Sequence, residues 1–337
     1  TAWAPGARSP NRDGRHGWVV MASTGRAFDW LVQCTPSEAE IGVSVMPGDL
    51  LILSRLQFAF VIAFHIIFPA LTVGLASYIA VLEGLYLARG DARYLRASWF
   101  WLRIFAVAFG MGVVSGIVMP FQFGTNWARF SDKTANVVGP LLAYEGLTAF
   151  FLEATFLGVL LFGRDRVPQW AHFGAAVLVA AGTLFSSFWI LAFNSWMQTP
   201  AGFAMEVDRF VPSSFSDVIF NPSFPYRLAH TVSAFYITTS FVVLGVAAYY
   251  LARQRHQETA GLMARMAVFF LAVMTPLQIF LGDAHGLNTL QYQPAKIAAM
   301  EGLWETSAPA PAVLFAIPDQ DAQANRFEVA VPHLASL

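Results

Sequence analysis

The sequence is poor in charged residues and has almost no cysteine. Asp, Glu, Lys and Arg make up 12% of its 337 residues, whereas about 25% is usual in a soluble domain. This deficit excludes an ordinary water-soluble globule, and a formal net charge of -1 excludes a protein that binds nucleic acid by electrostatics. Cys34 is the single cysteine. An internal disulfide or thiolate cluster is therefore excluded, and a metal site would need His, Met or carboxylate ligands.

Hydrophobic residues dominate instead. They make up 56% of the chain, and aromatic residues make up 15%, which also excludes a disordered protein. A membrane-spanning helix needs about 20 largely apolar residues, and six stretches of the sequence meet that need. They are Phe58–Leu82, Ile104–Phe121, Val137–Gly163, Trp170–Met197, Leu228–Ala252 and Met266–Gly282. The predicted fold class is all-α, a polytopic transmembrane helix bundle with six spans.

The basic residues predict how these spans are oriented. The loops after the first, third and fifth spans hold nine Lys and Arg, whereas the longer segments after the second, fourth and sixth spans hold six. Basic loops stay on the cytoplasmic side, so the N-terminus and residues 286–337 are expected outside the cytoplasm. Four arginines near the N-terminus argue mildly the other way.

Three regions are expected along the chain. Residues 1–47 contain much Pro, Gly, Ser and Arg and no apolar run long enough for a signal peptide. They are expected to be a disordered or non-native extension, with Met46 as the natural start. Residues 48–285 form the six-helix membrane region, and residues 286–337 form a polar segment outside it.

Two histidines fall within predicted spans, where a polar group is costly unless it is paired or ligated. The predicted orientation places His65 and His230 in the outer half of the membrane. Neutral imidazole is a common axial ligand of haem iron, and a hydrogen-bonded packing role is the alternative. His172 is expected at the cytoplasmic interface, and His285 in a polar segment without a special role.

Two carboxylates, Glu145 and Glu153, lie on the third span. Their eight-residue spacing in an unbroken α-helix separates them by about 12 Å along the axis and about 80° around it. Such a vertical pair suits a proton path, and a packing hydrogen bond is the alternative for either residue. Arg55, just before the first span, could pair with an anionic group such as a haem propionate or extend to the interface. Gly112 and Gly116 form a small-residue pair that could let two helices approach closely.

The polar segment after the sixth span contains one amphipathic stretch, Lys296–Glu305, with apolar residues at helical spacing. It predicts a turn or two of helix on the outer surface, for which an ordinary interfacial helix is the plain interpretation. Oxidation of a quinol requires an apolar slot for the ring and bases that accept its hydroxyl protons. Lys296, Glu301 and Trp304 have side chains of those types.

Several long motifs, in order from about residue 48 onward, resemble subunit I of the cytochrome bd-type quinol oxidases. The residues that carry the resemblance are Leu53–Ala59 leading into His65, Phe121–Trp127, Gly139–Gly146, Phe150–Glu153, Trp189–Ala192, Asn194–Met197, His230–Val232, Lys296–Glu305 and Ile317–Gln320. The phrases at Phe109–Gly112 and Val114–Gly116 are most similar to the cyanide-insensitive branch.

The resemblance implies a role for each candidate residue. His65 matches the ligand of an oxygen-site haem, Glu145 the carboxylate close to that haem, and His230 an axial ligand of the low-spin b-type haem. Glu153 matches an acidic residue of the proton path, and Lys296 with Glu301 matches the loop that contacts quinol.

The resemblance also implies the setting: a bacterial inner (plasma) membrane enzyme that oxidises quinol, reduces oxygen to water and generates a proton motive force. Its cofactors would be haem b, low-spin and high-spin, and haem d or a second haem b. Its partners would be subunit II and a small single-span subunit. Family members carry further haem ligands on later helices, so this chain is expected to be an incomplete subunit that is inactive alone. Without the resemblance, a proton-coupled transporter using the two glutamates and a haem-free assembly subunit are the alternatives.

Overall fold

The computed structural model describes residues 47–334. The expectations for the N-terminal extension and for Met46 therefore concern residues outside the described part. The chain divides into two units, Thr1–Ile52 and Leu53–Leu337. The described part of the first unit is the beginning of one helix, and the second unit contains all the contacts described below.

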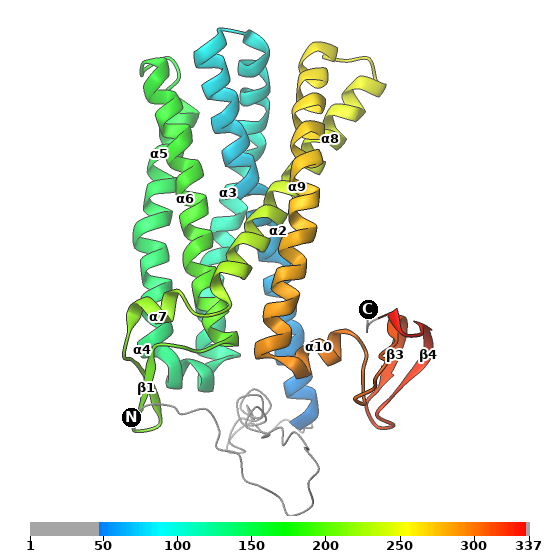
Figure 1. The fold of residues 1–337 in the computed structure, drawn as a ribbon. Helices are drawn as coiled ribbons and strands as arrows, with labels where there is room; N and C mark the ends of the chain where they lie inside the picture. Colours follow the sequence, from blue (N-terminus) through cyan, green and yellow to red (C-terminus); the bar gives the residue numbers. More distant parts are fainter. Residues whose placement is uncertain (1–46, 335–337) are drawn as a thin grey trace, which may run out of the picture. The chain divides into compact units, whose positions relative to one another are not determined.

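Six helices are long and apolar enough to cross a membrane (Figure 1). One of them is built from three consecutive segments, α4, the π-helix η1 and α5. The bounds are α2 Pro47–Arg89, α3 Ala92–Thr125, α4 Ala128–Tyr144, η1 Glu145–Phe150, α5 Phe151–Phe162, α6 Gln169–Gln198, α8 Phe224–Ala252 and α9 Gln257–Tyr292. These six helices confirm the predicted all-α bundle of six spans. A helix is the expected form of such a span, because lipid offers no hydrogen-bond partners to the backbone.

The last long helix runs further than its apolar stretch. The sixth predicted span ends at Gly282, but α9 continues to Tyr292. The shorter helices are α7, Phe215–Ile219, and α10, Pro294–Met300. The amphipathic segment that was expected from Lys296 to Glu305 is thus helical only as far as Met300.

Two β-hairpins, which hydropathy does not predict, complete the described residues. Strands β1, Phe203–Glu206, and β2, Arg209–Pro212, pair antiparallel, and so do β3, Ala312–Asp319, and β4, Ala324–Val331. Val207 and Asp208 join the first pair with φ values of 45° and 66°. Positive φ at both loop residues matches the right-handed twist of the flanking strands.

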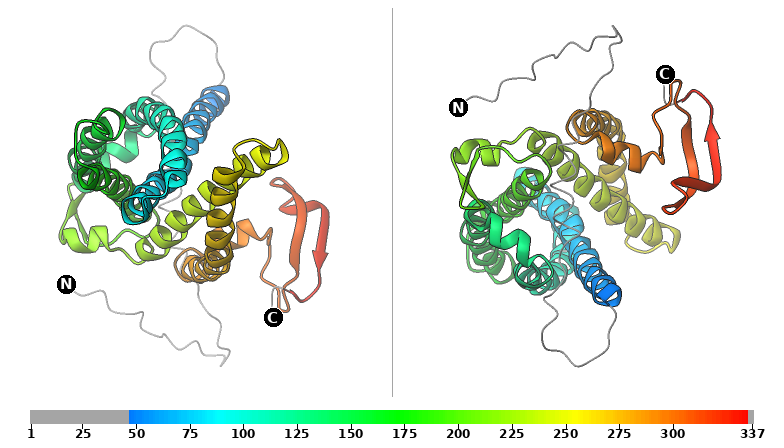
Figure 2. Two further views of the ribbon diagram at one scale, coloured as in Figure 1. Left: turned by 90° about the horizontal axis from the view of Figure 1, so that it is seen from above. Right: turned by 90° about the horizontal axis from the view of Figure 1, so that it is seen from below.

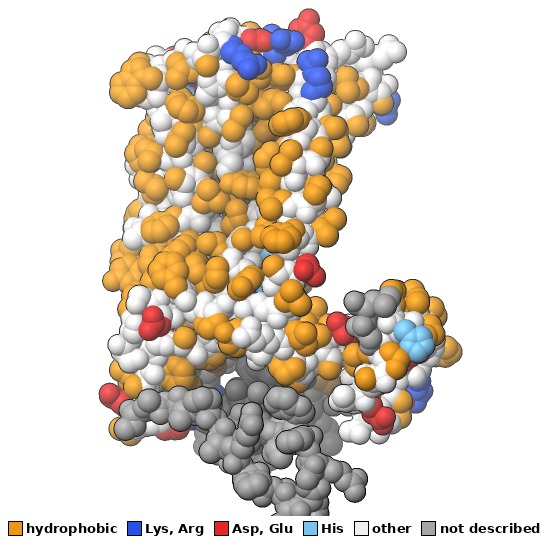
Figure 3. Space-filling model, viewed as in Figure 1, with side chains coloured by type: hydrophobic (Ala, Val, Ile, Leu, Met, Phe, Trp, Pro, Cys, Tyr) orange, Lys and Arg blue, Asp and Glu red, His pale blue; other side chains and the backbone are white. Residues whose placement is uncertain are grey.

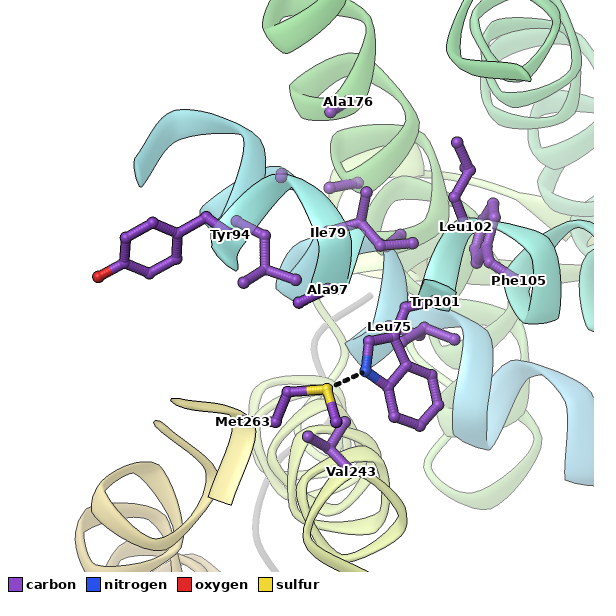
Figure 4. Packing of buried hydrophobic residues seen from close by; sticks show 14 of the residues in the cluster. Leu75, Ile79, Tyr94, Ala97, Trp101, Leu102, Phe105, Ala176, Val243 and Met263 are labelled. Atoms are coloured by element: carbon purple, nitrogen blue, oxygen red, sulfur yellow. Dashed lines mark hydrogen bonds between the residues drawn. The ribbon is translucent and has the colours of Figure 1, made fainter. Parts of the chain in front are cut away.

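The largest buried cluster among the described residues joins side chains from α2, α3, α5, α6, α8 and α9 (Figure 4). Leu75, Ile79 and Phe105 are fully buried in it, and Trp101 donates its indole N–H to Met263 Sδ at 3.2 Å. Figure 2 shows α8 and α9 beside the group formed by α3, α4, α5 and α6. Large apolar side chains also cover the outer faces of the helices (Figure 3), as expected of a chain that faces lipid.

The basic loops lie at one end of the helices. Figure 1 shows the connections α2–α3, α5–α6 and α8–α9 at the same end, and Figure 3 shows Lys and Arg side chains gathered there. The loops after the first, third and fifth spans therefore share one side of the bundle, as the predicted orientation requires. Which end faces the cytoplasm stays a prediction.

Candidate functional site

His65 on α2 is half-buried and is held by α3. Its Nδ1 lies 3.0 Å from Ser115 Oγ, and that hydroxyl donates its single proton to the carbonyl oxygen of Met111 at 2.8 Å, with the carbonyl of Gly112 at 3.1 Å. Ser115 therefore accepts from an Nδ1–H of His65. The tautomer with Nδ1 protonated leaves the lone pair of Nε2 free, which is the state required of an axial haem ligand.

Two glycines of α3 let this histidine approach. A Cβ at Gly116 would lie 3.2 Å from His65 Cε1, and a Cβ at Gly112 would lie 3.2 Å from Phe68 Cβ. Both distances are tighter than ordinary van der Waals contact, so a side chain at either position would push on α2. The predicted close approach at this small-residue pair is confirmed.

Glu145 and Glu153 both face α6. Ser186 Oγ donates to Glu145 Oε1 at 2.7 Å, and a Cβ at Gly182 would lie 2.6 Å from Glu153 Cγ. Gly182 and Ser186 are four residues apart and so share one face of α6. Glu153 is buried, and its Oε1 has no hydrogen-bond partner among the described residues.

The π-helix explains why both carboxylates point the same way. Glu145 begins η1 and Glu153 follows it in α5. A π-turn takes up one extra residue, so eight residues rotate the chain about as far as seven in an α-helix, roughly 700°. The two side chains then differ by about 20° instead of 80°. The azimuth expected for an unbroken α-helix is therefore wrong.

His230 on α8 is surrounded by one face of α9. Gln278 Nε2 lies 3.3 Å from each ring nitrogen and 3.2 Å from the backbone oxygen of His230. A Cβ at Gly282 would lie 3.4 Å from His230 Cε1, and the His285 ring centroid lies 5.4 Å from that of His230. His285 lies in the polar segment, as expected, but that segment continues α9 and packs on His230, a contact that was not expected. The apolar run ends at Gly282, whereas the helix does not.

The residues assigned to quinol contact lie at the end of α9 and beyond. Lys296 Nζ donates to Gln198 Oε1 at 3.1 Å, which ties α10 to the end of α6. Burial, followed by the charge of Arg227, lowers the pKa of Lys296. Glu301 is exposed at the C-terminal cap of α10, and Arg55 is exposed on α2.

A buried polar network at the opposite ends of the helices was not anticipated. Glu83 on α2 accepts hydrogen bonds from Ser98 and Arg164, and its Oε2 lies 3.2 Å from His172 Nδ1. His172 is 1% exposed, and its Nε2 lies 3.1 Å from the backbone oxygen of Leu160. The expected interfacial position of His172 is wrong, because the ring is drawn inward to a carbonyl that the C-terminus of α5 leaves unpaired.

The arrangement offers separate ligands and no multidentate metal centre. No three His, Cys, Asp or Glu side chains between residues 47 and 334 are placed to hold one metal ion. A haem needs only one or two axial ligands, because the porphyrin supplies the other four. The free Nε2 of His65 and the buried, unpartnered nitrogens Arg227 Nε and His285 Nε2 fit such a group.

Most of the chain is similar in sequence to known proteins. The family model described as cytochrome bd terminal oxidase subunit I matches residues 53–337. The chain is 40% identical over 294 residues to cytochrome bd-II ubiquinol oxidase subunit 1 of Escherichia coli, covering 86% of this chain and 57% of that protein. It is 36% identical over 288 residues to cytochrome bd ubiquinol oxidase subunit 1 of Bacillus subtilis, covering 85% and 61%.

A solved structure agrees with these matches. The bd oxidase of Geobacillus thermodenitrificans matches with a TM-score of 0.77 at 29% identity, covering 85% of this chain and 66% of that one. The chain spans about three fifths of the length of these two curated relatives, 57% of the Escherichia coli protein and 61% of the Bacillus subtilis protein.

Proposed function

Because the chain belongs to the family of cytochrome bd terminal oxidase subunit I, we propose that it is the haem-bearing subunit of a terminal quinol oxidase. The enzyme oxidises membrane quinol, reduces oxygen to water and contributes to a proton motive force. One observation carries the proposal furthest: Ser115 occupies His65 Nδ1 at 3.0 Å and leaves Nε2 free as a ligand. A histidine that served only in packing would gain nothing from a free nitrogen in an apolar helix bundle.

The proposed ligands come from three different helices. His65 on α2 would hold the oxygen-site haem, with Glu145 as the nearby carboxylate, and His230 on α8 would hold the low-spin haem. The bound haems, b-type or with haem d at the oxygen site, supply the electron transfer and the oxygen chemistry. Ser115 and the close contact with Gly116 fix the ring of His65, and Gln278 with Gly282 and His285 restricts the ring of His230. Arg55 remains a candidate for a propionate.

Protons move along the face of α6 in this proposal. Glu153 would hold a proton on a carboxyl whose Oε1 has no partner within the described part of the chain, and Ser186, one turn from Gly182, donates to Glu145. A hydroxyl both accepts and donates a hydrogen bond. Ser186 can therefore take up or release a proton at Glu145, on the same face of α6 that Glu153 contacts at Gly182.

Quinol is proposed to bind beside α10. Lys296 and Glu301 supply polar groups there, and a cavity of about 300 Å³ follows them, lined among others by Gly302, Trp304 and Asn325. Trp304 Nε1 donates to Asn325 Oδ1 at 2.8 Å, which fixes the indole at the cavity wall. A planar apolar side chain next to polar groups suits a quinol ring and its hydroxyls.

The setting follows from the same family. Subunit II, and a small single-span subunit, are the proposed protein partners, in a bacterial inner membrane with the polar segment after α9 outside the cytoplasm. Spectroscopy of the complete purified oxidase tests the proposal. A reduced-minus-oxidised spectrum should show low-spin and high-spin haem. A spectrum without haem would instead support a transporter or a structural subunit.

A further inference from the structure

A group of cationic and polar side chains lies near His230: Arg227, His285 and Lys296. Arg227 precedes His230 by three residues and so lies on the same face of α8, about one turn away. His285 faces His230 from α9, with 5.4 Å between ring centroids. The charges of Arg227 and Lys296 both act electrostatically on His285, so both cations lie within electrostatic range of that ring.

Two atoms of this group are buried without a partner. Arg227 donates through Nη1 to Asn194 Oδ1 at 3.1 Å, but among residues 47–334 neither its Nε nor His285 Nε2 has a partner. A buried polar atom left unpaired costs about 1–3 kcal/mol. Two such atoms, on residues that interact electrostatically, indicate that a further polar group belongs there.

The charge of the group is also unbalanced. No ion pair formed within the described part of the chain includes Arg227 or Lys296. Their hydrogen-bond acceptors, Asn194 and Gln198, are neutral amides. The missing group is therefore an anion, and a guanidinium with a free Nε is the side chain best suited to bind a carboxylate.

We propose that Arg227 and His285 bind a carboxylate, and that this carboxylate is a propionate of the haem held by His230. The inference rests on the proposed function, which places that haem against His230. A haem carries its two propionates on one edge, and Arg227, one helical turn from His230 on α8, would be placed to pair with one of them. The phosphate of a lipid headgroup offers the same anionic oxygen chemistry, so the experiment must separate the two sources.

The test uses the complete oxidase purified with Arg227→Gln, Arg227→Lys, or the control Arg209→Gln. Arg209 is exposed and pairs with Asp132 away from this group. Two properties are measured on each protein: the midpoint potential of the low-spin haem, and the redox-induced infrared difference spectrum of haem labelled with ¹³C at the propionate carboxyls.

A positive charge beside the propionate disfavours the ferric haem, so Arg227→Gln should lower the midpoint potential and shift the isotope-sensitive bands. Arg227→Lys should restore the potential in part, and Arg209→Gln should change neither property. If Arg227→Gln does not take up haem, Arg227→Lys decides alone, because its different donor geometry should still shift the isotope-sensitive bands.

Unchanged potential and unchanged isotope-sensitive bands in a variant that keeps its low-spin spectrum would overturn the propionate assignment and leave the proposed function standing. A lipid phosphate would then be the better occupant. Absence of a low-spin spectrum in the unmodified oxidase would instead overturn the proposed function.

Discussion

Gly182 on α6 packs directly on Glu153, so that a Cβ at Gly182 would lie 2.6 Å from Glu153 Cγ. Space for the buried carboxyl thus depends on the absence of one methyl group. No described residue forms a hydrogen bond with Glu153 Oε1 that could hold the side chain elsewhere.

Gly182→Ala should displace Glu153 or separate α5 from α6. Overpacking of this kind destabilises a protein by about 1–3 kcal/mol, so the melting temperature of the purified protein should fall, and oxygen reduction should slow. Gly174→Ala on the same helix is the matched control, because no atom of the described residues that could obstruct a Cβ lies within 4 Å of it there. Equal melting temperatures for the two variants would contradict the packing.

Glu153→Gln should preserve assembly and haem content but slow steady-state oxygen uptake, because an amide keeps the size of the side chain and cannot release a proton at neutral pH. Glu153→Asp should recover part of the rate by restoring a carboxyl, limited by its shorter reach. Turnover per haem in the complete oxidase is the measurement. If the Gln variant turns over as fast as the wild type, Glu153 is a packing residue and its proposed role in the proton path is wrong.

Gly116→Ala should disturb the haem site at His65, because the new Cβ would lie 3.2 Å from the ring. The absorption of the high-spin haem should shift or weaken. Gly110→Ala is the control on the same helix, since a Cβ there meets nothing within 4 Å. Identical spectra for the two variants would show that α3 does not constrain the ring.

Glu83→Gln should destabilise the bundle without altering haem spectra, because it leaves the largely buried Arg164 without its carboxylate. Breaking a buried ion pair costs roughly 3–5 kcal/mol, and the lower end applies because the Arg164 side chain is 15% exposed. Glu258→Gln removes an exposed partner of Arg96 and should have little effect. Thermal unfolding in detergent compares the two, and equal stability would mean that the network is not structural.

Hydropathy was enough to predict the six helices, because lipid leaves a backbone few alternatives to a helix. The positions of His65, Glu145, Glu153 and His230 within spans followed from the same pattern. Their orientations did not, because the direction of a side chain depends on the exact count of residues per turn. The π-helix between Glu145 and Glu153 reduces the angle between their side chains around the helix axis from about 80° to about 20°.

The buried polar contacts of Glu83, His172 and His285 could not be predicted from the sequence, because their partners lie on helices that are distant along the chain. Glu83 directly follows the apolar run that ends at Leu82, and this position is the signal that could have identified it. His172 and His285 stand near the ends of apolar runs, where an interfacial or loop position is the default. Only the packing of α6 on α2 and of α9 on α8 draws the two rings inward.

The low-spin haem spectrum of His230→Ala in the complete oxidase bears on the whole proposal. His256→Asn is the control, since His256 is exposed with φ of 50°, a conformation that Asn tolerates. His230→Ala should lose the low-spin b-type signal and quinol-driven oxygen uptake while the high-spin signal at His65 persists, and the control should keep all three. A low-spin signal that is unchanged in His230→Ala would contradict the ligand assignment, and with it the path of electrons from quinol that is proposed for this chain.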